Sequence, residues 1–161
     1  MNGLGAVLLA DGPHASLGER AHLFDRFVGA WDCHYAHLAE DGSVTEEYDG
    51  RVTFGWIIDG WAMQDVWSGG GSVGTSIRWF DPNAGEWTVM WLAPQANVVI
   101  TVRGGAVGDR IVLHGEGQDG SLRQWSFNDI GPDSFVWRGE RSSDQGATWR
   151  LEAEYHMTRL G

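Results

Sequence analysis

The chain has 161 residues, 42% hydrophobic and 20% charged, with 22 acidic residues against 11 basic ones and a formal net charge of −11. This length fits one domain over residues 1–161, large enough to fold without a metal or a disulfide. The acidic charge argues against nucleic acid and anionic membranes as partners, because such a surface repels phosphate. The single cysteine, Cys33, excludes an internal disulfide and a cysteine-rich zinc site.

Residues 1–15 are expected to form a flexible or loosely packed N-terminus. They carry no basic residue before the apolar run Val7-Leu8-Leu9, which argues against a secretory signal. No window reaches 18 consecutive apolar residues, so the sequence predicts no transmembrane helix. We therefore expect a cytoplasmic protein.

One helix is predicted, over residues 17–28. Ser16 and Glu19 have the spacing of a capping box, and apolar residues then recur on one face as far as Val28. Gly29 follows as a natural end of the helix.

Everything after Gly29 is typical of β-strands of six to ten residues separated by short turns. Asp59-Gly60 and Gly69-Gly70-Gly71 are two of these turn signals. The turns are too short for parallel crossovers, so about ten strands should form an antiparallel meander. Such a meander closes most readily into an all-β up-and-down barrel, and a β-sandwich is the alternative.

Alternation along a strand predicts which side chains face the interior. On residues 31–37 the inward set is Trp31, Cys33, Tyr35 and His37. The next strands place inward Val52, Phe54, Trp56 and Ile58, then Trp61, Met63, Asp65 and Trp67. The last strand places inward Trp149, Leu151, Ala153, Tyr155 and Met157.

The junction Gly29-Ala30-Trp31 resembles the G-x-W signature of lipocalins and their calycin relatives. That resemblance implies a tryptophan at the closed end of the barrel, covered by an arginine from the last strand, which would be Arg159. The span from Leu23 to Leu160 also resembles a group of bacterial single-domain lipocalin-like proteins, most of uncertain function. The segment Gly74–Asp81, followed by Trp87 and Trp91, is the part most similar to that group.

Three other patterns favour less specific interpretations. His34 and His37 lie three apart on a strand and therefore on opposite faces, so they cannot share one metal ion. The segment Ser142–Trp149 matches the sialidase Asp-box, whose side chains stabilise their own turn. Some calycin-like barrels, the nitrobindins, bind haem through a histidine. The sequence after G-x-W here departs from theirs, so haem remains a minor alternative.

The predicted interior favours binding of a small hydrophobic, neutral or cationic molecule, aromatic or polycyclic ones included. The expected ligand-binding residues are Trp56, Trp61, Met63, Trp67, Arg78, Trp79, Trp91, Trp125, Trp137 and Tyr155. Alternatively, Asp65, His37 and Tyr35 could perform acid–base catalysis in the same cavity, as in an isomerase, cyclase or lyase that uses no cofactor. A third alternative is an interior filled by the ten tryptophans. We expect no metal or cofactor, and a homodimer is compatible with the sequence.

Overall fold

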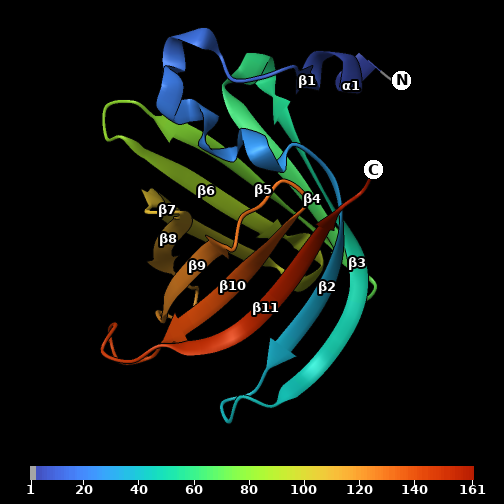
Figure 1. The fold of residues 1–161 in the computed structure, drawn as a ribbon. Coiled ribbons are helices and arrows are strands. Elements are labelled where there is room, and N and C mark those ends of the chain that lie inside the picture. Colours follow the sequence, from blue (N-terminus) through green and yellow to red (C-terminus); the bar gives the residue numbers. More distant parts are fainter. Residues whose placement is uncertain (1–2) are drawn as a thin grey trace.

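The computed structural model describes residues 3–161, in which eleven antiparallel strands are joined by short turns and helical segments (Figure 1). The strands are β1 (Leu9–Ala10), β2 (Gly29–Leu38), β3 (Val44–Ile57), β4 (Ala62–Gly69), β5 (Ser72–Asp81), β6 (Glu86–Ala93), β7 (Val98–Val107), β8 (Arg110–Glu116), β9 (Leu122–Asn128), β10 (Ser134–Ser142) and β11 (Arg150–Arg159). The helical segments are α1 (Gly3–Leu8) and the 3₁₀ helices η1 (Ala15–Leu17), η2 (Glu19–Phe27), η3 (Ile58–Gly60) and η4 (Pro94–Ala96).

Strands β2 to β11 form a closed barrel. Each strand pairs with the next along the chain, and β11 also pairs with β2, where Arg159 lies opposite Trp31. The predicted antiparallel up-and-down barrel is therefore confirmed, and the sandwich alternative is wrong. Turn residues that tolerate positive φ make the tight hairpins possible, as at Gly70 (φ 57°) and Gly71 (φ 80°) between β4 and β5.

The segment between the N-terminus and β2 covers one end of the barrel. We expected an α-helix over residues 17–28, but the chain forms η1 and η2, separated by Gly18 with φ 77°. The buried residues of η2 are Ala21, Phe24 and Phe27. Their spacing of three matches the 3₁₀ period, so these three side chains lie in one row that faces the barrel.

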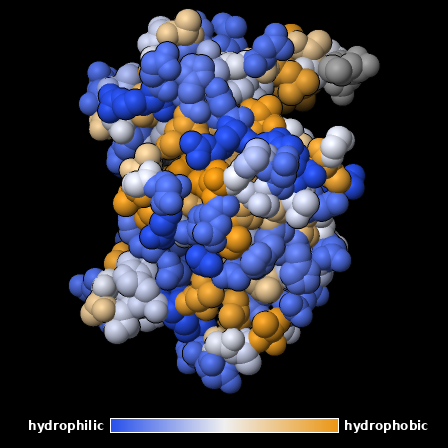
Figure 2. All heavy atoms as spheres, viewed as in Figure 1, coloured by the Kyte–Doolittle hydropathy of each residue, from blue (hydrophilic) through white to orange (hydrophobic). Residues whose placement is uncertain are grey.

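Residues 3–15 precede this cover and contain α1 and β1. Strand β1 extends the sheet by pairing with β3, and Leu9 lies opposite Ile57. No residue of α1 is buried, and Leu4 and Val7 are exposed hydrophobic side chains. Figure 2 shows hydrophobic surface beside the N-terminus, and further hydrophobic patches in the middle and toward the lower end of the same face. Within residues 3–161, no helix is both long and apolar enough to cross a membrane.

The contact between Trp31 and Arg159 confirms the arrangement that the lipocalin resemblance implies. Trp31 is fully buried, and the guanidinium carbon of Arg159 lies 4.1 Å from the centroid of its ring. Arg159 also donates hydrogen bonds to the backbone carbonyls of Arg26, Val28 and Pro132. Arg159 thus joins the end of β11 to the segment that closes the barrel.

The predicted inward orientations are confirmed for most residues of the first three barrel strands. The confirmed residues are Trp31, Cys33 and Tyr35 of β2, Val52, Phe54 and Trp56 of β3, and Met63, Asp65 and Trp67 of β4. The inward orientations of Ile58 and Trp61 are wrong, because these side chains are 49% and 46% exposed. Positive φ angles at Ile58 and Asp59 end the strand alternation, and β4 begins only at Ala62. Trp61 instead stacks on His14, with 4.1 Å between the ring centroids.

A β-bulge between β10 and β11 changes the predicted faces at the start of β11. Gly139 pairs with Ala153, whereas the adjacent Glu140 pairs with Leu151, so one residue of β11 is extra. One extra residue reverses the faces of the residues beyond it. Accordingly, Trp149 and Leu151 lie outside the hydrophobic core, contrary to prediction, and Glu152 lines the barrel cavity.

Candidate functional site

The barrel contains a cavity of about 330 Å³. The cavity lies between the aromatic residues of the closed end and the opposite end, where the turns after β2, β4, β6, β8 and β10 gather. Eight predicted site residues line it: Tyr35, His37, Trp67, Arg78, Trp91, Trp125, Trp137 and Tyr155. This volume is far above the roughly 10–15 Å³ that a single water needs, so the tryptophans do not fill the barrel.

The other predicted site residues lie outside this cavity lining. Trp56 and Met63 are buried in the core, where the Trp56 Nε1 donates to Asp25. Trp61 precedes β4, as described above. Trp79 is 39% exposed because its strand neighbours, Arg78 and Phe80, both face inward. The predicted inward orientation of Trp61 and the assignment of Trp79 to the cavity are therefore corrected.

One side of the cavity is a continuous aromatic surface, which we call the aromatic wall and define as Trp67, Trp125, Trp137 and Tyr155. Trp137 stacks on Tyr155 with 4.7 Å between ring centroids and 16° between planes. Trp125 lies 5.7 Å and Trp67 6.2 Å from Trp137. These side chains come from β4, β9, β10 and β11, so the closed barrel is what brings them together.

Glycines leave room for these rings. A Cβ atom at Gly139 would lie 2.8 Å from the Trp137 ring, and one at Gly69 would lie 2.9 Å from both Tyr35 and Tyr48. Glycine inside a strand often marks a place where another group approaches the backbone closely. This was the signal in the sequence that could have identified the crowded side of the cavity.

All three tyrosines of the chain, Tyr35, Tyr48 and Tyr155, line the cavity. Tyr35 stacks on Tyr48 at 4.8 Å and meets Tyr155 edge to face at 4.7 Å. The Tyr48 hydroxyl lies 3.0 Å from Nε2 of His37, and the Tyr35 hydroxyl donates to the Ser68 carbonyl. Burial raises the pKa of all three phenols above the usual value of 10.0. They are therefore neutral hydrogen-bonding groups at physiological pH.

We expect an alkaline titration to show little tyrosinate formation near pH 10 while the protein stays folded. The folded phenols have raised pKa values, so they stabilise the fold fully below the unfolded pKa of 10.0 and lose this contribution as pH rises through the folded values. Tyrosinate absorbance measured against pH, beside the circular dichroism of the folded state, tests this. A transition with a midpoint near pH 10 in folded protein would show that the tyrosines are hydrated.

Asp65 faces inward and is completely buried, as predicted, but its partners differ from those expected. It forms an ion pair with Arg78 and accepts hydrogen bonds from Nε1 of Trp67 (2.7 Å) and the backbone N–H of Ser76 (2.8 Å). We expected His37 or Tyr35 as its partner. Asp65 is also absent from the cavity lining, so the structure groups Tyr35 with His37 around Tyr48 and leaves Asp65 apart.

Arg78 is the charged group of the inner cavity. Its guanidinium carbon lies 4.6 Å from the centroid of Phe24, 5.4 Å from that of Phe54 and 5.9 Å from that of Phe127. Burial lowers its pKa to about 9, so it remains protonated at neutral pH. Its Nη2 bonds Asp65, whereas its Nε and Nη1 are buried and have no hydrogen-bond partner among the described residues 3–161.

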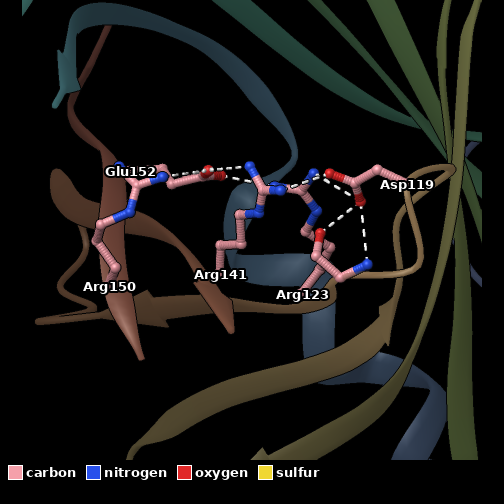
Figure 3. Close-up of polar contacts among 6 residues, drawn as sticks. Asp119, Arg123, Arg141, Arg150 and Glu152 are labelled. Carbon is pink, nitrogen blue, oxygen red and sulfur yellow. Dashed lines mark hydrogen bonds and ion pairs between the residues drawn. The ribbon is translucent and has the colours of Figure 1, made fainter. Parts of the chain in front are cut away.

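A second polar group, which we call the arginine cluster, lies at the open end and consists of Arg123, Arg141 and Arg150 with Asp119 and Glu152 (Figure 3). Glu152 contacts all three guanidinium groups, with N–O distances of 2.7 Å to Arg123, 3.3 Å to Arg150 and 3.7 Å to Arg141. Arg141 also bonds Asp119, and hydrogen bonds from Ser121 are the main reason that the Asp119 pKa falls to about 2.

The sequence-based prediction missed this cluster. Arg123 and Glu152 line the cavity, but strict alternation had placed Glu152 outside. The bulge on β11 brings it inward, and no residue in the sequence marks the bulge clearly.

No protein-family model and no curated protein sequence matches this chain. Among solved structures, the chain is similar to the S-type phycobiliprotein lyase CPES from Guillardia theta, with a TM-score of 0.60, 13% sequence identity, and coverage of 86% of this chain and 90% of that chain. It also aligns with EF1p2_mFAP2b, solved bound to DFHBI, with a TM-score of 0.42, 14% identity, and coverage of 88% and 100%. The similarity to the lyase, at 13% identity, supports the closed antiparallel barrel fold.

Proposed function

We propose that this protein binds a small hydrophobic molecule with a flat aromatic or conjugated ring system inside the barrel. The observation that carries this proposal is the aromatic wall beside an unfilled cavity of about 330 Å³. Ligand cavities usually have volumes of about 300–1,000 Å³ and combine an apolar lining with a few polar groups. This cavity lies at the lower end of that range, which favours a ligand of a few fused rings.

Burial and charge support binding over acid–base catalysis in which Asp65 is the base. The Asp65 carboxylate is paired with Arg78 and accepts hydrogen bonds from Trp67 and Ser76, and Asp65 is not part of the cavity lining. The phenol of Tyr35 has a raised pKa, so it holds its proton near neutral pH. A general base must lie within hydrogen-bonding reach of the substrate proton, and Asp65 does not meet this condition. The lyase name belongs to the structural neighbour, whose 13% identity supports the fold alone.

The aromatic wall can be tested with N-phenylnaphthylamine, a neutral aromatic probe whose fluorescence rises in apolar surroundings. We expect saturable binding to the native protein and about tenfold weaker binding to Trp137→Leu, because a ring pair contributes up to about 1.5 kcal/mol beyond its buried area. Fluorescence titration gives both Kd values.

Trp79→Leu is the matched control, since it makes the same replacement on the outer face of β5, where Trp79 is 39% exposed. We expect this variant to bind the probe as the native protein does. Equal weakening in the two variants would place the probe elsewhere, and no saturable binding to the native protein would contradict the proposed function.

A further inference from the structure

Arg78, a residue of the cavity lining, has two guanidinium nitrogens without a hydrogen-bond acceptor among residues 3–161. Its side chain is 1% exposed and lines the cavity, and only its Nη2 has an acceptor, the Asp65 carboxylate. Its Nε and Nη1 are buried without a partner among residues 3–161. Leaving a buried charged donor without an acceptor is costly, and nearly all buried polar groups in folded proteins are paired. These two nitrogens therefore lack an acceptor from residues 3–161, and a ligand atom beside Arg78 would supply one.

The charge balance around Arg78 selects the kind of acceptor. Asp65 already neutralises the guanidinium, and the pair is otherwise enclosed by Phe24, Phe54 and Phe127. A ligand carboxylate would add a third buried charge without a counterion, which costs more than burying a neutral acceptor. A ligand cation would meet the Arg78 charge directly, so the structure disfavours the cationic guest that an inward Asp65 had suggested.

We propose that the ligand of this cavity is a neutral conjugated carbonyl compound, whose oxygen accepts hydrogen bonds from Nε and Nη1 of Arg78 while its ring system lies against the aromatic wall. A ketone, a quinone or a lactam has this combination of a flat ring system and a neutral acceptor. This inference rests on the proposed function and adds the chemical class of the ligand. Arg78 is then the residue that determines specificity for the carbonyl group.

Three naphthalenes that differ only in one substituent at the same ring position test the inference. Acetylnaphthalene carries a neutral carbonyl, ethylnaphthalene replaces that carbonyl by a methylene, and naphthoate carries a charge. Displacement of N-phenylnaphthylamine gives the three affinities. We expect acetylnaphthalene to bind at least about tenfold more tightly than either of the others, because hydrogen bonds from charged donors exceed a tenfold effect.

The variant Arg78→Lys keeps a positive charge beside Asp65 but removes the guanidinium nitrogens that remain free. We expect the ratio of the acetylnaphthalene and ethylnaphthalene affinities to fall to about one in this variant. Arg51→Lys is the matched control, because the Arg51 side chain is 61% exposed outside the cavity. If Arg78→Lys does not fold, the double variant Arg78→Met/Asp65→Leu removes both members of the ion pair. Its preference between acetylnaphthalene and ethylnaphthalene is then measured in the same way.

The outcomes distinguish this inference from the proposed function. Equal affinity of native protein for acetylnaphthalene and ethylnaphthalene would mean that Arg78 does not bind the carbonyl oxygen, which overturns the inference and leaves the proposed function standing. If naphthoate bound most tightly of the three, the inference that the ligand is a neutral compound would be wrong. A preference for acetylnaphthalene that survives in Arg78→Lys and in the double variant would overturn the role of Arg78. Failure of every probe to bind would contradict the proposed function itself.

Discussion

The variant Asp65→Leu should have a free energy of unfolding about 3–5 kcal/mol lower than the native protein, because removing one partner of a buried ion pair leaves the other charge uncompensated. Arg78 would then be a cation with 1% exposure and no counterion. Nε1 of Trp67 and the backbone N–H of Ser76 would also lose their acceptor. Urea unfolding followed by tryptophan fluorescence measures the loss.

The double variant Asp65→Leu/Arg78→Met is the control that isolates the charge. Replacing a buried ion pair by hydrophobic side chains of similar size is often neutral or stabilising, so the double variant should be more stable than Asp65→Leu alone. A double variant that is less stable than the single one would show that Arg78 does not depend on Asp65. A loss below about 1 kcal/mol in Asp65→Leu, the value of an exposed ion pair, would contradict the buried pair itself.

Local patterns were sufficient to predict the barrel. Alternation is a property of each strand, and it correctly predicted that Trp31, Cys33 and Tyr35 of β2 and Met63, Asp65 and Trp67 of β4 face the interior. The turn signals set the strand number. The resemblance of Gly29-Ala30-Trp31 to the lipocalin signature implied that Arg159 covers Trp31 at the closed end, and the contact at 4.1 Å agrees with this. Each of these inferences depends on residues that lie only a few positions apart in the sequence, or on residues near the two ends of the barrel-forming chain.

The partners of the inward residues could not be predicted in the same way, because they depend on register between strands. Asp65 lies opposite Ser76, which brings Arg78 within reach on the neighbouring strand. A shift of that register would give Asp65 another partner on the same face. The inward orientation of Asp65 was therefore predictable, whereas its ion pair with Arg78 required the structure.

Departures from regular strand geometry account for the remaining errors. The positive φ at Ile58 and Asp59 reorients Trp61, and the bulge opposite Gly139 and Glu140 brings Glu152 into the cavity. Trp79 and Arg78 are a different case, because adjacent residues of a regular strand face opposite sides and cannot both line one cavity. Hydrophobicity alone favours Trp79 as the inward member of this pair. The structure instead buries the charged Arg78 and leaves Trp79 39% exposed.

The variant Phe24→Ala should lose about 3–5 kcal/mol of unfolding free energy, the usual cost of truncating a buried phenylalanine. Phe24 has no exposed surface and joins the 3₁₀ helix η2 to the barrel. Its ring lies 4.8 Å from that of Trp87 and 5.6 Å from that of Phe127, and it covers the Arg78 guanidinium at 4.6 Å. Truncation therefore removes apolar contacts and one of the rings that shield the buried cation.

The variant Phe24→Leu is the control, because it retains most of the side-chain volume and should lose less than the alanine variant. The space left in Phe24→Ala adjoins Arg78, and Arg78 lines the cavity, so the truncation should also enlarge the cavity toward the closed end. We expect Phe24→Ala to accept a probe with one more fused ring more tightly than the native protein does, when both are compared at a temperature where each is folded. If both variants lost less than about 1 kcal/mol, Phe24 would not be a packed core residue, and η2 would not close the barrel as the structure indicates.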